Sequence, residues 1–425
     1  MKNHHIMFIA GEASGDMRAA GLARALKELD PYLRLTGIGG AFMRQAGVEC
    51  FTDITELAVI GIAEVVKNFS RIKRVFDQTL KQIETTCPDC VILVDYPGFN
   101  LRLAQEIKKR KILTGTGKPL KIIYYISPQV WAWREKRVLK IKELVDRMIV
   151  LFPFEQGIYS KYGMKVDYVG HPLVDEIKVG RNQTEVLKSI GLSTSKTTIG
   201  LMPGSRAKEV ERHLPCMLEA AQILFKHNRE RQFILLKAST IPLKLIEDII
   251  GSSKGPIIAS TSEGHVMASS FFKQNSKRSD KVTAPPMTPR KNILETLPLK
   301  IYDGPTYEGI NAMDVAMVAS GTATLETAML KKPMVIIYKT SWLTYCLAKT
   351  LIKIPYIGLV NIVAGKKIVE EYIQNDATPA HLSDALEAAL HNPQIIEDLA
   401  TVKTSLGQPG ASERAARVVL EELSN

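Results

Sequence analysis

Short apolar runs alternate with longer stretches of helical periodicity along most of this chain, and this alternation restricts its fold more than any other feature. In the N-terminal part we expect strands at residues 6–10, 33–38, 90–95, 121–126, 147–152 and 165–169. Strands that alternate with helices form βαβ units, in which the strands run parallel and ligands bind at their carboxyl ends. The pattern therefore predicts an α/β fold with a doubly wound, Rossmann-like sheet.

The alternation stops once and then starts again. Residues 176–197 are polar and poorly periodic, so we expect a linker there, and a second series of strands follows at 198–202, 233–238, 298–302, 315–319 and 334–338. A chain of 425 residues also exceeds the ~100–200 residues of an ordinary domain. We predict two Rossmann-like domains facing a cleft, at 1–175 and 198–400, with a helical tail at 401–425.

The segment 251–297 interrupts the second series. It is basic and rich in proline and serine, and Lys273, Arg278 and Lys291 are among its charges. Such a composition is typical of a surface insertion. The sequence leaves open whether this is a tolerated loop or an extra contact to anionic lipid or another partner.

The formal net charge of +12 would attract nucleic acid, an anionic membrane surface or a phosphorylated substrate. In one predicted basic helix Val65, Phe69, Ile72 and Phe76 recur on one face. This pattern is typical of a helix that lies on a membrane, although a core-packed helix with solvated lysines gives the same pattern. Basic residues are otherwise spread rather than interleaved with aromatics, so we expect no nucleic-acid partner.

The expected location is the cytoplasm. No apolar run approaches the ~20 residues of a membrane span, and the long apolar core of a signal peptide is missing before strand 6–10. The five scattered cysteines fit a reducing compartment better than a disulfide framework.

Asp95 is the strongest candidate for acid–base chemistry in the first domain. It ends an apolar strand, where a rigidly held carboxylate could accept a proton from a sugar hydroxyl. The alternative is an aspartate that caps the next helix, because Pro97 and Asn100 are also typical of a helix entry.

Two loops of the second domain suit a nucleotide diphosphate. Gly204, Ser205 and Arg206 follow a strand, and they would offer a phosphate close backbone N–H groups and a planar guanidinium. Ser320, Gly321 and Thr322 repeat the arrangement, and Glu326 could accept hydrogen bonds from a ribose. Either loop alone is ordinary, but both together favour diphosphate binding over simple packing.

We expect neither a cofactor nor a metal. The loop Gly11–Asp16 satisfies neither the Walker A nor the dinucleotide pattern, which argues against ATP and NAD. The chain also lacks Asp-x-Asp and a convincing cluster of histidines. The negative charge of a bound diphosphate would then be stabilised by Arg206, by helix N-termini and by Lys339.

Four segments together resemble the lipid A disaccharide synthases, a family of bacterial glycosyltransferases. They are Ala10–Asp16 with G-E-x-S-G-D, Val94–Asn100 with D-x-P-x-F-N, Tyr125–Trp133 and Leu201–Arg206. The resemblance runs from about Ile6 to about Gln374. It departs from the family at 251–297, where the connection is usually much shorter.

This resemblance implies a GT-B fold and an inverting, metal-independent transfer of a lipid-bearing sugar. The donor would be UDP-2,3-diacylglucosamine and the acceptor 2,3-diacylglucosamine 1-phosphate, joined through a β-1,6 bond with release of UDP. The enzyme would work peripherally on the inner face of the inner membrane. A UDP-sugar epimerase of the same architecture and a basic nucleic-acid-binding protein are the alternatives.

The resemblance also implies roles for particular residues. Asp95 is the expected general base. We assign acceptor binding or cleft closure to Glu12, Ser14, Asp16, Trp131, Trp133 and His171, although a histidine before proline is often structural. UDP would be held by Gly204, Ser205, Arg206, Ser320, Gly321, Thr322, Glu326, Lys339 and Asn361. Asn361 matches a family asparagine that normally follows proline, and Val360 replaces that proline here.

Overall fold

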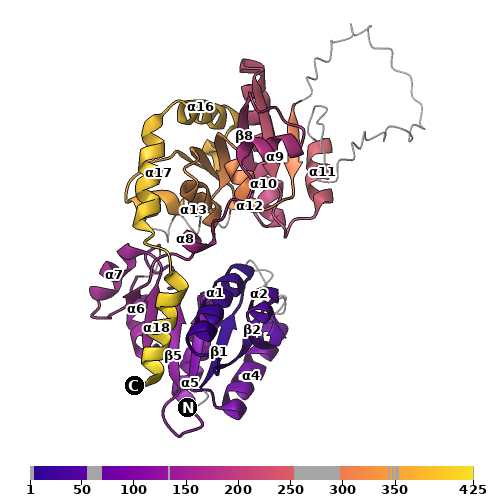
Figure 1. Cartoon of the computed structure of the whole chain (residues 1–425). Helices are drawn as coiled ribbons and strands as arrows, with labels where there is room; N and C mark the ends of the chain where they lie inside the picture. Colours follow the sequence, from indigo (N-terminus) through magenta and orange to yellow (C-terminus); the bar gives the residue numbers. More distant parts are fainter. Residues whose placement is uncertain are drawn as a thin grey trace, which may run out of the picture. The chain divides into compact units, whose positions relative to one another are not determined.

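The chain forms two compact units in a computed structural model (Figure 1). The structure describes residues 4–54, 69–132, 135–252, 297–342, 345–346, 349 and 354–424. The first unit comprises Met1–Glu176, Ala348–Pro355 and Lys403–Asn425, and the second comprises Ile177–Leu347 and Tyr356–Val402.

The first unit is built on a parallel sheet of order β3-β2-β1-β4-β5-β6-β7. Its strands are β1 (His5–Ala10), β2 (Arg34–Gly39), β3 (Glu49–Asp53), β4 (Cys90–Val94), β5 (Lys121–Tyr125), β6 (Arg147–Val150) and β7 (Asp167–Tyr168). The chain builds outward from β1 to one side and then from β4 to the other. Ligands of doubly wound sheets bind in the crevice at such a reversal, which here lies at the ends of β1 and β4.

Helices cover both faces of this sheet (Figure 1). They are α1 (Ala13–Leu29), α2 (Ala41–Gln45), α4 (Phe69–Thr86), α5 (Pro97–Arg110), α6 (Arg137–Leu144), α7 (Pro153–Ser160), α8 (Leu173–Glu176) and α18 (Ala411–Ser424). In β4, Val91 and Leu93 belong to the core that α4, α5 and α6 complete, whereas Ile92 and Val94 belong to the core under α1 and α18. Successive side chains of a strand point to opposite faces of the sheet, and both faces are buried here. The whole strand is therefore apolar.

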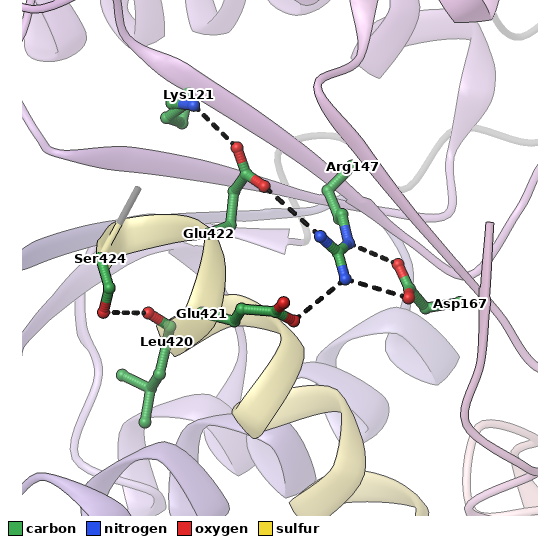
Figure 2. A network of polar contacts seen from close by, with 7 residues as sticks. All are labelled: Lys121, Arg147, Asp167, Leu420, Glu421, Glu422 and Ser424. Carbon is green, nitrogen blue, oxygen red and sulfur yellow. Dashed lines mark hydrogen bonds and ion pairs between the residues drawn. The ribbon is translucent and has the colours of Figure 1, made fainter. Parts of the chain in front are cut away.

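The last helix, α18, is tied to this sheet by ion pairs (Figure 2). Glu422 is buried, and its carboxylate lies 2.8 Å from Lys121 Nζ and 3.7 Å from Arg147 Nη1. Arg147 also contacts Asp167 at 2.5 Å and Glu421 at 3.1 Å. Residues near the C-terminus thus complete a unit whose sheet comes from the first part of the chain.

The second unit repeats the plan with a parallel sheet of order β10-β9-β8-β11-β12-β13. Its strands are β8 (Thr197–Met202), β9 (Arg231–Leu236), β10 (Leu299–Tyr302), β11 (Val315–Ala319), β12 (Met334–Tyr338) and β13 (Glu371–Ile373). The reversal of strand order lies between β8 and β11, so this unit should bind its ligand at the ends of those two strands.

The helical elements of this part are α9 (Gln183–Ser189), α10 (Ala207–His227), α11 (Leu243–Ser252), α12 (Thr306–Asn311), α13 (Thr322–Met329), α15 (Leu359–Ala364), η2 (Gln374–Asp376), α16 (Pro379–Leu390) and α17 (Pro393–Ser405). The last residues of α17 already belong to the first unit.

The predicted strands are confirmed to within a few residues, but the strands β3 and β13 and the helices α8 and α9 were missed. β3 and β13 are half-buried edge strands, so neither shows the continuous apolar run that identifies a central strand. The expected linker at 176–197 contains α9. Its start is fixed by a capping box in which Asn182 and Glu185 bond each other's backbone N–H groups, a local signal that overrides the weak periodicity.

The predicted membrane helix is only partly described. Val65 lies outside the described residues, as does most of the expected insertion at 251–297. Phe69 is 57% exposed, but Ile72 and Phe76 pack against the core of the first unit, and the Phe76 ring meets Phe99 edge-on at 5.4 Å. For those two residues the core-packed interpretation is correct. No described helix combines the length and the hydrophobicity required to cross a bilayer.

Candidate active site

Asp95 lies at the point where β4 ends, in an unusual backbone conformation. Asp95 and Tyr96 both have positive φ angles, +47° and +46°, which cost non-glycine residues about 1–3 kcal/mol each. The Asp95 carbonyl oxygen accepts hydrogen bonds from Tyr124 Oη at 2.6 Å and Asn100 Nδ2 at 2.7 Å, and its N–H donates to Tyr125 at 3.1 Å. Surrounding side chains therefore hold this residue in a strained geometry, as is common at active sites.

The surroundings of Asp95 make it a stronger base than an ordinary aspartate. Burial, and secondarily the carboxylate of Glu12, raise its pKa to about 6, against a smaller lowering by the Tyr96 backbone N–H. Glu12 follows β1, which pairs directly with β4, so the two carboxylates meet at the reversal of strand order. At neutral pH Asp95 is mostly ionised and still basic enough to accept a proton.

Gly11 is required because Tyr96 covers it. A Cβ atom on Gly11 would lie 2.3 Å from Cδ1 of the Tyr96 ring. The glycine of the first motif thus makes room for the residue that follows Asp95, so two of the sequence motifs meet in space. Ser14 is exposed on the first turn of α1.

Asp16 has a different role from the one we expected. Its buried carboxylate accepts hydrogen bonds from the backbone N–H groups of Gly40 (2.7 Å), Phe42 (3.1 Å) and Met43 (3.1 Å). These groups are the unsatisfied donors at the start of α2, which a carboxylate caps well. Asp16 therefore fastens α2 to α1, and the expectation that it binds the acceptor is corrected.

Trp131 lies in an aromatic cluster after β5 and β6. Its ring meets Phe154 edge-on at 5.6 Å, and Phe154 stacks on Phe152 at 5.4 Å. Trp133 lies outside the described residues. Beside this cluster Glu155 is buried, which raises its pKa to about 7 although it accepts a hydrogen bond from Phe152 N–H. Sequence reasoning missed Glu155, for which the only signal was its place in the first turn of a helix.

His171 is a buried, neutral histidine. Its Nδ1 accepts a hydrogen bond from Leu173 N–H at 3.1 Å, and its ring packs on Phe152 at 5.3 Å. Burial and then the positive charge of Arg18 lower its pKa to about 3. The structural alternative for His171 is thus correct, and acid–base catalysis by this residue is not supported.

In the second unit, Glu209 organises the loop after β8. Gly204 has φ +120°, and a Cβ atom there would lie 2.6 Å from Glu209 Oε2. The Glu209 carboxylate accepts hydrogen bonds from Ser205 N–H (3.2 Å) and Arg206 Nη1 (3.0 Å). Arg206 remains 48% exposed at the N-cap of α10, where an anionic ligand can reach its guanidinium.

The loop after β11 lies next to this one, because β11 pairs with β8. Ser320 Oγ donates to Ile357 O at 3.0 Å, and Thr322 is exposed where α13 begins. Glu326 is half-buried one turn further. The sheet therefore brings the two predicted diphosphate loops together at the reversal of strand order, as expected.

Asn361 lies fully buried in α15. Its Nδ2 donates to Val369 O (2.9 Å) and Glu371 Oε1 (2.7 Å), and its Oδ1 accepts from the N–H groups of Ile368 (2.8 Å) and Val369 (3.1 Å). All four hydrogen-bonding positions of its amide are used. Asn361 therefore shapes the α15 region through these hydrogen bonds, and its predicted contact with UDP stays a prediction.

His213 is a residue that sequence reasoning missed. Its Nδ1 lies 2.8 Å from Pro203 O, and its Nε2 lies 2.9 Å from Lys339 N–H. Because Nε2 must accept, the neutral ring carries its proton on Nδ1, and burial lowers its pKa. His213 thus ties the loop after β8 to Lys339 at the end of β12. A histidine inside a helix gives no sequence signal for such a role.

Among the residues that the structure describes, no group of three or more His, Cys, Asp or Glu side chains could hold a metal ion.

The comparisons with known proteins decide the family. The family model described as lipid-A-disaccharide synthetase matches residues 6–257 and 279–420. The chain belongs to this family. The match leaves out residues 258–278, which lie within the segment that we expected to be inserted.

Members of this family from other bacteria are similar to the chain over nearly its whole length. It is 38% identical to the lipid-A-disaccharide synthase of Syntrophus aciditrophicus (strain SB), with 99% of this chain and 98% of the relative covered. It is 40% identical to that of Geobacter sulfurreducens (strain ATCC 51573 / DSM 12127 / PCA), with the same coverage. The resemblance read from the four motifs is therefore confirmed.

Distant solved structures share the fold of this family member. UDP-GlcNAc 2-epimerase from Neisseria meningitidis has a TM-score of 0.61 at 11% identity, covering 98% of this chain and 100% of the other. The calicheamicin glycosyltransferase has a TM-score of 0.57 at 12% identity, and the match covers 100% of this chain and 99% of the other. Such low identity shows the fold alone, so the prediction of two Rossmann-like domains is confirmed, and the epimerase alternative gains no more than a shared architecture.

Proposed function

We propose that this protein is a lipid-A-disaccharide synthase that transfers 2,3-diacylglucosamine from UDP-2,3-diacylglucosamine to the 6-hydroxyl of 2,3-diacylglucosamine 1-phosphate. The observation that carries this proposal is the basic carboxylate of Asp95, whose backbone is clamped by Asn100, in a chain that belongs to the family over nearly its whole length. The products are UDP and a β-1,6-linked disaccharide 1-phosphate.

Asp95 acts as the general base. Its carboxylate takes the proton of the acceptor 6-hydroxyl while that oxygen bonds to the anomeric carbon of the donor, and the bond from this carbon to the UDP oxygen breaks. The configuration inverts because the attack comes from the face opposite to UDP. Burial and the Glu12 carboxylate support this role, since both raise the proton affinity of Asp95.

The second unit holds UDP and stabilises the negative charge that develops on it. Arg206 offers an exposed guanidinium beside the Ser205 N–H, and Lys339 lies at the end of a neighbouring strand. The N-termini of α10 and α13 favour negative charge at the same edge of the sheet. These groups supply the electrostatic stabilisation without a divalent ion.

The enzyme works at the cytoplasmic face of an anionic membrane without crossing it. Its net charge of +12 favours such a surface, and Phe69 and Trp342 offer large exposed apolar side chains. The aromatic cluster around Trp131 faces the acyl chains of the substrates.

The test is UDP release from UDP-2,3-diacylglucosamine by purified protein in detergent and EDTA, with and without 2,3-diacylglucosamine 1-phosphate. Acceptor-dependent release supports a metal-independent transferase. If UDP release requires added Mg²⁺, the transferase activity stands and only its independence of a metal is contradicted. If folded protein releases no UDP with or without Mg²⁺, the function is wrong, and conversion of UDP-N-acetylglucosamine would then identify an epimerase.

A further inference from the structure

A basic cavity lies beside the Asp95 loop in the first unit. It occupies about 350 Å³ between the N-terminal parts of α5 and α6 and is lined by Pro97, Gly98, Leu101, Arg102, Arg137 and Lys140. Three of these side chains are cationic and none is acidic. A concave surface with charges of one sign concentrates the opposite charge, so the cavity suits an anion.

Two cations of this cavity, Arg102 and Lys140, form no ion pair with the described residues. Arg102 is exposed and has no hydrogen-bond or ion-pair partner within the described ranges. Lys140 Nζ donates at 2.8 Å to Gln105 Oε1, which is uncharged. The positive charge of Arg137 acts on Tyr124, whose hydroxyl donates to the Asp95 carbonyl, so this side of the cavity adjoins the Asp95 loop.

The N-terminus of α5 adds to the positive electrostatic potential of this cavity. This helix is 14 residues long and begins with Pro97, which has no N–H to leave unsatisfied. Gly98 is exposed, and a Cβ atom added there would meet nothing within 4 Å, so the backbone is open to a ligand. An anion at this end of the helix also gains from the helix dipole.

We propose that this cavity binds the phosphate monoester of the acceptor, a sugar 1-phosphate. The inference rests on the proposed function. In this sugar the two ring carbons that flank the ring oxygen carry the phosphate and the 6-hydroxymethyl group. Five residues of helix span only about 7.5 Å from Pro97 to Arg102, so a phosphate held at Arg102 keeps the 6-hydroxyl of the same sugar near Asp95, just before the helix.

Recognition of the phosphate would explain how one lipid-bearing sugar is chosen as the acceptor and the other as the donor. The guanidinium of Arg102 and the ammonium of Lys140 pair with the phosphate oxygens, which is a charge-assisted contact. The same arrangement positions the 6-hydroxyl at Asp95, so the phosphate contributes to orientation as well as to affinity.

The test compares acceptors with and without the 1-phosphate in the variants Arg102→Gln and Lys140→Gln, assayed in neutral detergent. Each variant should lower kcat/KM for the phosphorylated acceptor about 10- to 100-fold, as expected for loss of a charged hydrogen bond, and leave KM for the donor unchanged. With 2,3-diacylglucosamine lacking the phosphate, variants and wild type should be equally slow. The matched control is Lys109→Gln, which removes a charge from a 74% exposed site on the same helix and should behave as wild type.

A variant that slows both acceptors equally, or neither, would overturn the proposal. Flotation with phosphatidylglycerol vesicles tests whether the cavity binds the phosphate of lipid headgroups instead of the acceptor phosphate. If the variants lose vesicle binding but keep the wild-type preference for the phosphorylated acceptor, the cavity serves lipid headgroups and the proposal fails.

Binding of glucosamine 1-phosphate, followed by ³¹P NMR, tests the cavity independently of turnover. Wild type should bind it more tightly than Arg102→Gln does. If wild-type protein has no transferase activity, the proposed function fails, and this binding difference still shows whether the cavity takes a sugar phosphate. Equal binding by wild type and variant would then refute the cavity assignment as well.

Discussion

Asn100 Nδ2 donates a 2.7 Å hydrogen bond to the carbonyl oxygen of Asp95 and thereby fixes the backbone from which the candidate base projects. Asn100 is fully buried and also lies 3.2 Å from Val94 O. The asparagine of the D-x-P-x-F-N motif is therefore a positioning residue, which explains why it stands five residues after the aspartate.

Replacing Asn100 by alanine should reduce kcat about 10- to 100-fold with little change in KM for the donor, because Asp95 would relax from its left-handed conformation. Buried carbonyls would also lose their donor, which costs about 1–3 kcal/mol of stability. Steady-state kinetics and thermal unfolding measure the two effects. A purely structural role would lower stability but leave kcat and the apparent pKa of the acid limb unchanged.

Asp95 should set the acid limb of the pH profile. Since a general base must be ionised, kcat/KM should fall as the pH drops through about 6, and Asp95→Asn should abolish this limb together with nearly all turnover. A profile that stays flat down to pH 5 would exclude Asp95 as the base.

The raised pKa of Asp95 also makes the stability of the folded protein depend on pH. The folded state holds the Asp95 proton up to about pH 6 and the unfolded chain only up to about 3.8, so stability should decrease as the pH rises through this window. The loss is on the order of 2–3 kcal/mol. Asp95→Asn should therefore unfold at the same or a higher temperature than wild type at pH 7.5, measured by calorimetry. A lower unfolding temperature would argue against a destabilising carboxylate.

Arg206→Gln should lower kcat about 10²- to 10³-fold, since it removes a cation from the developing charge of UDP. Glu209 would lose one partner but keep the Ser205 N–H, so the loop should remain folded. Rapid-quench measurement of UDP formation provides the rate. Lys208→Gln, on the same exposed turn, is the control for loss of charge alone.

Asp16→Ala should destabilise the protein by about 1–3 kcal/mol, because three N–H groups at the start of α2 lose their acceptor. Denaturant unfolding would show this, with Glu28→Gln on the exposed side of α1 as the control. A loss of acceptor affinity without a change in stability would restore the binding role that we first expected.

Glu422→Gln should also destabilise the first unit by about 1–3 kcal/mol, because the buried carboxylate pairs with Lys121 and Arg147. Glu421→Gln changes a carboxylate that is 62% exposed and should cost less than about 1 kcal/mol. Equal effects of the two substitutions on thermal unfolding would contradict the importance of the buried pair.

Local patterns were sufficient to predict the centre of each sheet and the position of Asp95. A buried parallel strand is apolar throughout, as in Val91–Val94, and the residue that follows it must lie at the ligand edge. β3 and β13 lack this signal because most of their side chains are only half-buried, so neither strand has a continuous apolar run.

The roles of Asp16, His213 and Asn361 were not predictable from local pattern. Asp16 meets its partners on α2, well after α1, and His213 meets Lys339 from a distant strand. Only the folded chain brings such groups together. A polar residue in a glycine-rich motif therefore looks the same in the sequence whether it binds a ligand or caps a helix.

The ion pairs of α18 also affect the order in which this protein can be assembled during synthesis. The chain leaves the first unit at Glu176, returns for the short stretch Ala348–Pro355 and returns again at Lys403, so the sheet of that unit emerges from the ribosome long before α18. The apolar surface under α18, including Ile123 and Tyr125 of β5, stays partly uncovered until residues 411–424 have been synthesised. The second unit is encoded later, but all of it precedes Lys403, so it can complete its core while the first unit still lacks α18.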